Sequence, residues 1–388
     1  MKQGWEIKKL GEVCDIINGF AFKSNLFTDE GEDILRISNI QNGYVDLTDI
    51  AHFSKDDYPK TNFEKYAVLP NDIVVALSGA TTGKFGINKT GKKLYLNQRV
   101  AICRESSSEL NHLFLLYYLQ TQSKSFLESA EGVAQPNLST EQMKQYDIAI
   151  PPREEQERIV AELDCLSGII EKKREQLREL DALAQSIFYQ MFGDPITNEK
   201  RWEVKKLGEV CISDLGKTLD SKKNKGNLYN YLCSVNVQWG YFDLTTLKEM
   251  RLEESELERY SVKQGDLLIC EGGDTGRCAI WNSEEPMYYQ NALHRVRFTP
   301  STILPIFCQY IMLYMKQNGE IDKYSKGQTI KHLVKSALMS IPIVMPPIAL
   351  QQEFADKIDA IEKQKELIKK SISETETLFN ARMDYYFN

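Results

Sequence analysis

The chain has 388 residues, of which 42% are hydrophobic and 27% charged, and its formal net charge is −7. This composition is typical of a water-soluble globular protein with two or three domains. No apolar run reaches the ~20 residues of a membrane-spanning helix, and the N-terminal residues lack the apolar core of a signal peptide. The eight cysteines are scattered without a Cys-x-x-Cys pair. This spacing argues against a zinc site or a disulfide framework and indicates free thiols in a cytoplasmic protein.

A long internal repeat is the first feature along the chain. The opening segment 5–14, WEIKKLGEVC, returns as WEVKKLGEVC at 202–211, and NIQNGYVDL at 39–47 returns as NVQWGYFDL at 236–244. The Pro-Pro pair at 151–152 returns at 346–347, each time with a glutamine four residues after its second proline. Solenoid repeats are far shorter than this. The repeat therefore predicts a duplicated domain followed by a duplicated connector.

Each copy of the domain mixes strand and helix patterns. In the first copy, 73–77 reads as a buried strand, 99–103 as a half-buried strand and 111–121 as a helix. The second copy repeats this plan with strands at 267–270 and 292–298 and a helix at 307–315. Gly193-Asp194-Pro195 marks a break between the halves. We expect two homologous mixed α/β domains, 1–152 and 193–347, in an α+β protein.

The connectors 153–192 and 348–388 read as long helices. Apolar residues recur at alternating spacings of four and three, which predicts a coiled-coil seam with a period of 3.5. At ~1.5 Å per residue each helix is about 60 Å long. Antiparallel pairing of the two would place one domain at each end and give approximate two-fold symmetry. The predicted seam comprises Ile159, Leu163, Leu166, Ile170, Leu177, Leu180, Ile187, Phe354, Ile358, Ile361, Ile368, Ile372 and Phe379.

These motifs together resemble the DNA specificity subunit of type I restriction–modification systems. The resemblance covers essentially the whole chain and rests on Trp-x-x-x-x-Leu-Gly-Glu-Val at each domain start, GFAFKS at 19–24, the glycine turn at 78–84 and the Pro-Pro-x-x-Glu-Gln start of a long helix. The second copy departs from it with GKTLDS at 216–221 and with Leu350 in place of the glutamate. These departures put equal partner contacts by the two halves in doubt.

The resemblance implies a noncatalytic subunit without a cofactor. Each target-recognition domain would read one half of a bipartite, asymmetric site on double-stranded DNA, and the helices would set the gap between the halves. Two methyltransferase subunits would dock about the pseudo-axis, and restriction subunits would join through the complex. In agreement, the four histidines show no metal-ligand spacing. The competing readings are a self-sufficient nuclease or methyltransferase with an unrecognised site, and a coiled-coil scaffold for two protein partners.

The glycine turns at 79–84 and 272–277 invite comparison with a phosphate-binding loop. The first is one residue too short for that motif and has Phe85 where the magnesium-binding hydroxyl belongs. Two readings remain open, a tight turn between strands or a turn that meets a DNA phosphate or base. The residues that would make this contact are Ser78, Thr82, Lys84, Thr275 and Arg277.

Other candidates for DNA contact lie where the two copies diverge or where polar loops precede the connectors. Asn39 and Gln41 could read adenine, but they are repeated as Asn236 and Gln238, which favours a structural turn. The basic cluster at 222–225 could equally be a solvated loop. The glycine-hinged loops before each Pro-Pro pair could equally cap the next element. The remaining DNA-binding candidates are Lys23, Gln135, Asn137, Lys217, Lys222, Lys223, Asn224, Gln328 and Lys331.

Overall fold

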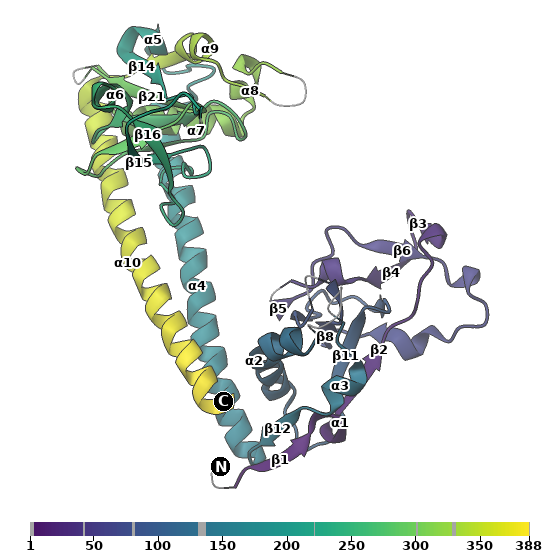
Figure 1. The fold of residues 1–388 in the computed structure, drawn as a ribbon. Coiled ribbons are helices and arrows are strands. Elements are labelled where there is room, and N and C mark those ends of the chain that lie inside the picture. Colours follow the sequence, from purple (N-terminus) through teal and green to yellow (C-terminus); the bar gives the residue numbers. More distant parts are fainter. Residues whose placement is uncertain are drawn as a thin grey trace. The chain divides into compact units, whose positions relative to one another are not determined.

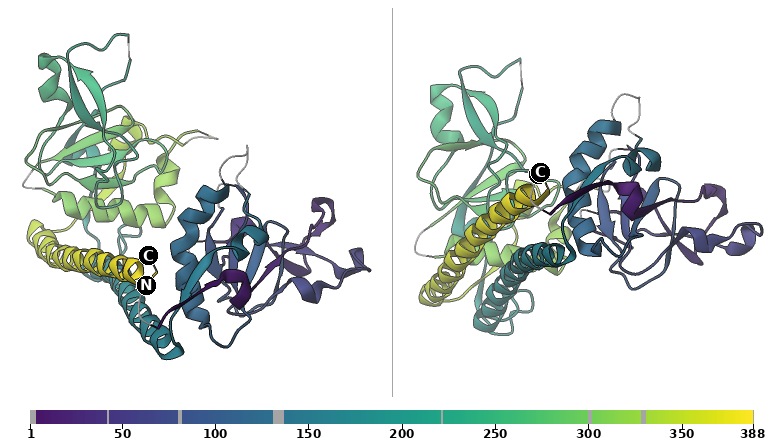
Figure 2. Two further views of the ribbon diagram at one scale, coloured as in Figure 1. Left: turned by 60° about the horizontal axis from the view of Figure 1, so that its bottom comes forward. Right: turned by 90° about the horizontal axis from the view of Figure 1, so that it is seen from below.

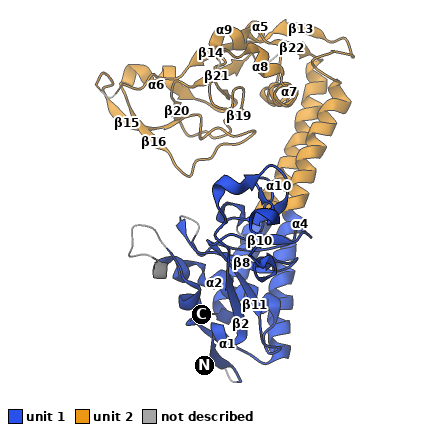
Figure 3. Cartoon of the chain, turned by 90° about the vertical axis from the view of Figure 1, so that its right-hand side faces the viewer, with its two compact units in different colours: residues 1–173, 371–388 blue, residues 174–370 orange. Residues whose placement is uncertain are grey.

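The computed structural model describes residues 4–41, 43–79, 82–130, 137–220, 222–299, 302–327 and 331–387. The chain forms two compact units, residues 1–173 with 371–388 and residues 174–370 (Figure 3). The boundary between them falls within helix α4 (Arg153–Phe192) and helix α10 (Ile348–Phe387), so each unit holds part of both helices. Each unit is described on its own. In the described part of the chain, no helix is both long and apolar enough to cross a membrane.

The repeated WEIKKLGEVC segment forms a strand that runs directly into a one-turn helix. In the first unit this is β1 (Glu6–Lys9) and α1 (Leu10–Val13), and β1 pairs antiparallel with β12 (Asp147–Ile150). The helical turn buries Leu10 and Val13, which anchors the start of the domain in its core. The second unit repeats the arrangement with β13 (Glu203–Lys206), α5 (Leu207–Val210) and β22 (Pro342–Met345).

Two mixed sheets form the body of the first unit (Figure 1). The central sheet has strongly apolar strands, because both of its faces are covered. Its order is β2 (Cys14–Asn18), β11 (Val100–Glu105), β8 (Ile73–Ala76), β9 (Phe85–Ile87) and β5 (Gly43–Tyr44). The outer sheet has the order β3 (Phe27–Thr28), β6 (Ala51–Phe53), β4 (Glu32–Leu35), β10 (Leu94–Leu96) and β7 (Ala67–Val68).

The second unit repeats both sheets with four strands in each instead of five. The central order is β14 (Cys211–Leu215), β21 (Leu293–Phe298), β18 (Leu267–Cys270) and β19 (Cys278–Ile280). The outer order is β16 (Lys248–Leu252), β15 (Asn227–Leu232), β20 (Met287–Tyr289) and β17 (Ser261–Val262). The mixed α/β prediction is therefore confirmed for both copies. The remaining helices are α2 (His112–Ala130) and α3 (Thr140–Lys144) in the first unit, and α6 (Glu254–Tyr260), α7 (Pro305–Gln317), α8 (Glu320–Tyr324) and α9 (Lys335–Met339) in the second.

The predicted helix at 111–121 was too short. Helix α2 continues to Ala130 because Phe126 lies in the core and packs edge-on against Tyr146. The residues between the predicted end at 121 and Phe126 are polar, so the sequence pattern does not show that the helix continues. The predicted boundaries of α4, by contrast, agree with the structure.

Each unit closes its core with both long helices. In the first unit, Ile159 and Leu163 of α4 pack in one cluster with Met383 and Tyr386 of α10, and Arg382 Nε lies 2.7 Å from Glu162 Oε1. In the second unit, Lys365 Nζ lies 2.7 Å from Asp181 Oδ1. Early residues of α4 thus meet late residues of α10 and the reverse, so the helices pair antiparallel (Figure 2).

The predicted seam faces inward throughout, since each of its residues is buried or half-buried. At the end of α4, however, the most deeply buried residues are not those of the predicted seam. There Phe188 and Phe192 are each 1% exposed, whereas the predicted Ile187 is only half-buried. The reason is that both phenylalanines pack against Phe307 of α7 as well as Phe354 of α10. The helix therefore follows the domain surface at this end rather than a strict heptad.

Candidate nucleic-acid interface

The glycine turn of the first domain joins β8 to β9. Gly83 N donates to Ala76 O at 2.9 Å, and the Thr82 hydroxyl donates to Gly79 O at 2.7 Å. Gly79 and Gly83 have φ of 80° and 79°, in the region that favours glycine. Thr82 is 4% exposed and belongs to the turn itself. Lys84 is half-exposed and has no side-chain partner among the described residues.

The corresponding turn of the second domain is closed by an equivalent backbone hydrogen bond but has a different charge environment. Gly276 N donates to Cys270 O at 3.0 Å, and Thr275 is 1% exposed. Arg277 Nη2 donates to Ser234 O at 2.8 Å. The arginine therefore fastens this turn to the neighbouring loop, whereas Lys84 does not. For both threonines the structure supports the reading as a tight turn.

Each glycine turn lies beside two further loops. Leu77 N donates to Arg99 O at 2.9 Å and Leu138 N donates to Leu77 O at 2.7 Å, while Ser78 bridges to Asn137. We call the residues gathered here, 78–79, 82–84, 97–99 and 137, the first loop edge. Its counterpart, the second loop edge, comprises 272–277, 290–292 and 331–332, where Glu271 N donates to Ala292 O at 2.9 Å and Leu333 N donates to Glu271 O at 2.7 Å.

Several predicted DNA contacts belong to these loop edges. Asn137 is exposed, whereas the Ser78 hydroxyl is buried and finds no partner among the described atoms. Lys331 is exposed, and its ammonium lies 2.7 Å from Asp322 Oδ2, a contact that lowers the pKa of Asp322. Gln135 and Gln328 lie outside the described residues.

Lys23 and Lys217 do not behave alike. Lys23 is exposed; its backbone amide donates to the Tyr58 hydroxyl at 3.0 Å, and its carbonyl accepts from Leu26 N at 2.9 Å. Lys217 is 6% exposed and its ammonium bonds Glu256. A lysine held in this way is an internal structural residue, so we do not carry it forward as a surface contact.

The basic cluster of the second domain is organised by one aspartate. Asp220 Oδ1 accepts from Lys222 N at 3.0 Å and from Lys223 N at 3.2 Å. Asn224 is half-buried and donates to Thr218 O at 3.3 Å. The side chains of Lys222 and Lys223 remain exposed, so this loop keeps both readings, solvated surface and DNA contact.

The repeated amides are structural. Asn39 Oδ1 accepts from Arg36 N at 3.0 Å, and its amide nitrogen donates to Asp46 O and Asp49 O, both at 3.1 Å. Asn236 makes the equivalent bonds with Cys233 N, Asp243 O and Thr246 O. Both are almost fully buried and cannot reach a base edge, which confirms the prediction of a structural turn.

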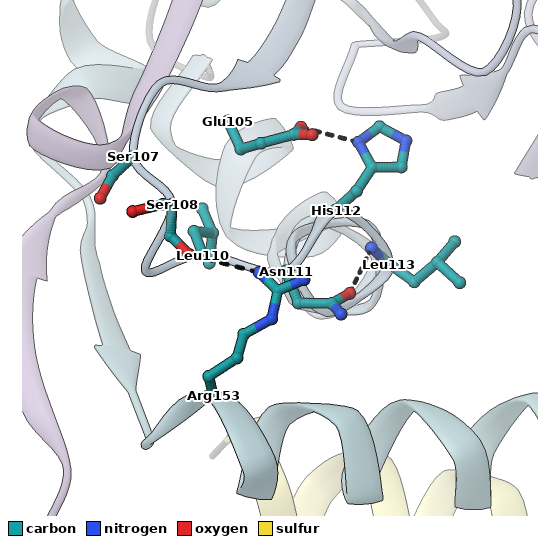
Figure 4. Close-up of a pocket in the computed structure, with 8 residues that line it drawn as sticks. All are labelled: Glu105, Ser107, Ser108, Leu110, Asn111, His112, Leu113 and Arg153. Carbon is teal, nitrogen blue, oxygen red and sulfur yellow. Dashed lines mark hydrogen bonds and ion pairs between the residues drawn. The ribbon is translucent and has the colours of Figure 1, made fainter.

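A hollow of about 530 Å³ lies at the other end of β11 in the first unit (Figure 4). His112 is held there between Glu105 Oε2 and Asn71 O, both at 2.8 Å. Arg153, the other basic side chain lining the hollow, is bonded to Glu157 Oε1 at 3.0 Å. Because each basic side chain is already bonded to an acceptor, this hollow does not offer a site for an anion. No metal-binding group of His, Cys, Asp and Glu occurs among the residues that the structure describes.

Sequence reasoning missed Gln98 and Arg99. Both are exposed on the first loop edge, in the turn between β10 and β11. The available signal was a pair of amide residues between two apolar strands, Asn97-Gln98, repeated as Gln290-Asn291 in the second copy. It could have been recognised by its position in the repeat, but not by composition alone.

Comparison with known sequences places the repeat in a described family. The type I restriction modification DNA specificity domain matches residues 2–180 and again residues 199–377. The Escherichia coli type I restriction enzyme EcoAI specificity subunit is 33% identical over 48% of this chain and 33% of its own length. The EcoKI specificity subunit of Escherichia coli strain K12 is 23% identical over 96% of this chain and 85% of its own length.

Solved structures share the fold along the whole chain. The type I restriction–modification S subunit from M. genitalium superposes with a TM-score of 0.57 at 15% identity, over 99% of this chain and 96% of that one. A chain of another type I restriction–modification system gives a TM-score of 0.61 at 17% identity, over 100% and 98%. This chain therefore shares their fold.

Proposed function

Because the chain belongs to the type I restriction–modification DNA specificity family, we propose that it is the sequence-specific DNA-recognition subunit of such a complex. It reads double-stranded DNA and leaves methyl transfer and cleavage to partner subunits. One observation of this chain carries the proposal further than the family does. Each domain presents a loop edge built on the same backbone hydrogen bonds, and the exposed side chains of the two edges differ.

This arrangement suits a bipartite, asymmetric target. The recognition domains are residues 1–152 and 193–347, and each reads one half-site. A shared backbone frame gives both domains the same approach to DNA, while divergent side chains give them different sequences to read. Lys84, Asn137, Lys222, Lys223 and Lys331 are the contacts that we carry forward from the sequence, with Lys23 on the exposed outer surface of the first domain.

The helices 153–192 and 348–388 serve as the spacer and as part of the docking surface for partners. Two methyltransferase subunits bind, one for each half of the chain, and restriction subunits join through that complex. The duplicated junction of strand, Pro-Pro pair and helix supports this count, since Gln156 and Gln351 build it in the same way in both halves.

The test is a methylome. The chain is expressed with its methyltransferase partner in a host without such systems, and modified bases are mapped by long-read sequencing. We expect one bipartite asymmetric motif that requires both proteins. Cofactor binding or cleavage by the purified chain alone would instead favour a self-sufficient nuclease or methyltransferase. A stable complex without a modified motif would favour a scaffold.

A further inference from the structure

The backbone of the turn Asn97-Gln98-Arg99 is held by hydrogen bonds to neighbouring segments. Gln98 N donates to Phe20 O at 2.8 Å, Phe20 N donates to Leu96 O at 2.9 Å, and Asn97 N donates to Leu35 O at 3.0 Å. A Cβ on Gly19 would lie 2.1 Å from Asn97 O, so the glycine is needed for this close approach. The turn is thus a rigid support for whatever side chains it carries.

The side chains on this support point outward. Gln98 and Arg99 are exposed, and neither makes a side-chain hydrogen bond or ion pair with a residue that the structure describes. Other arginines of this domain are engaged. Arg104 pairs with Asp72, and Arg36 Nη2 donates to Asp49 O at 2.9 Å. Arg99 therefore combines a fixed backbone with an uncompensated guanidinium.

The surroundings of Arg99 strengthen the case for a ligand. Its carbonyl accepts from Leu77 N, next to the glycine turn that carries Lys84, and Leu77 O accepts from the Leu138 amide beside exposed Asn137. A planar guanidinium with an ammonium and an amide on neighbouring loops is suited to base edges flanked by phosphates.

The second domain builds a turn with equivalent hydrogen bonds but without the arginine. Asn291 N donates to Lys217 O at 2.8 Å, and Glu271 N donates to Ala292 O at 2.9 Å. A Cβ on Gly216 would lie 2.3 Å from Gln290 O, so the close approach is kept as well. These hydrogen bonds are retained while Arg99 is replaced by Ala292, where the backbone differs because Ala292 has a φ of 134° and Arg99 has no positive φ.

We propose that Arg99 is a specificity-determining residue that reads a guanine of the first half-site through its O6 and N7 atoms. Arginine to guanine is the commonest bidentate contact in the major groove. Ala292 makes no such contact, so the second half-site has no guanine read from this position. The proposal rests on the proposed DNA-recognition function and adds to it a residue and the base that it recognises.

The test compares Arg99→Ala with wild type, each assembled with the methyltransferase partner. We expect the methylome of the variant to lose its requirement for guanine at one position of the first half-site. The gap and the second half-site should be unchanged. Binding to the wild-type site should weaken roughly 10- to 100-fold, and binding to sites already lacking that guanine should hardly change. Arg99→Gln, which keeps a long polar side chain, should shift the preferred base from guanine towards adenine.

Lys89→Ala is the control, since Lys89 is exposed and follows β9 at the opposite end of that strand from Lys84. An unchanged motif in both Arg99 variants overturns the proposal. So does equal weakening on all sequences with a salt slope lower by ~0.9, which is the mark of a phosphate contact. If wild type itself gives no bipartite motif, the proposed function fails, and that result is distinct from a failure of Arg99 alone.

Discussion

Buried Lys217 forms an ion pair with half-buried Glu256 at the place where the first domain has an aromatic cluster. The backbone position is the same, because Lys217 bridges to Gln290 as Phe20 bridges to Asn97. Phe20 packs against Phe22, Tyr58, Phe63 and Tyr66. The two domains thus support equivalent turns with different chemistry.

We expect Lys217→Ala to destabilise the second domain by about 2 kcal/mol, because it leaves Glu256 without its cation in a partly buried site. Replacing both residues by Met and Leu should restore most of this loss, since an apolar pair needs no compensation. Urea unfolding followed by hydrogen exchange in β20 measures both variants. Lys222→Ala, at an exposed lysine, is the control and should leave exchange unchanged.

The same pair gives a pH dependence. The Lys217 ammonium lowers the pKa of Glu256 below its ordinary value. A carboxyl with a lowered folded pKa stabilises the fold above its unfolded pKa of ~4.3, and this contribution is lost as the pH falls through the folded value. The urea midpoint of wild type should therefore fall more steeply below about pH 5 than that of Glu256→Gln. Equal slopes would show that the pair does not contribute.

We expect Gln156 and Gln351 to contribute equally to the stability of their domains. Each is fully buried and joins the first turn of a long helix to the loop before the domain helix. Gln156 accepts from Asn111 N at 2.7 Å, and Gln351 accepts from Leu304 N at 2.9 Å. Alanine at either position leaves buried backbone groups unpaired, at about 1–3 kcal/mol. Faster amide exchange at Asn111 or Leu304 checks this, and the neighbouring exposed Gln352→Ala should have no effect.

Removing the positive charge from each glycine turn should affect DNA binding in the first domain and stability in the second. Lys84→Ala should lower the salt slope of DNA binding by ~0.9 without loss of stability, since Lys84 has no partner among the described residues. Arg277→Ala should instead loosen the second domain, because its bond to Ser234 O is lost. Binding titrations at several salt concentrations, with melting curves, separate these outcomes. An unchanged slope for Lys84→Ala would make the first turn purely structural.

The helices should set the gap in the DNA target. One heptad inserted after Lys173 and one before Ser371, at the boundaries between the two units along the chain, adds ~10 Å to each helix. Both insertions keep the seam in register, and Lys173 donates to Ser371 in the native pair. We expect a methylome motif with a longer gap and unchanged half-sites. A changed half-site with the original gap would contradict the spacer role.

Periodicity and duplication predicted much of this fold. The heptad spacing identified an inward-facing seam, and the repeat identified two mixed domains, because both depend on local pattern. The sheet orders could not be predicted, since the parallel pairing of β4 with β10 depends on contacts far apart in sequence. The burial of Lys217 could not be predicted either, because its partner Glu256 lies on a helix 39 residues away in the sequence.

The core of the first domain contains residues from the far end of the chain. Met383 and Tyr386 of α10 pack with Ile159 and Leu163. During synthesis, residues 174–370 emerge completely before Met383 does. The domain that is translated first can therefore complete its packing only after the domain that is translated second. A ribosome that stalled within α10 would release a chain whose earliest-made half still exposes apolar surface to chaperones and proteases.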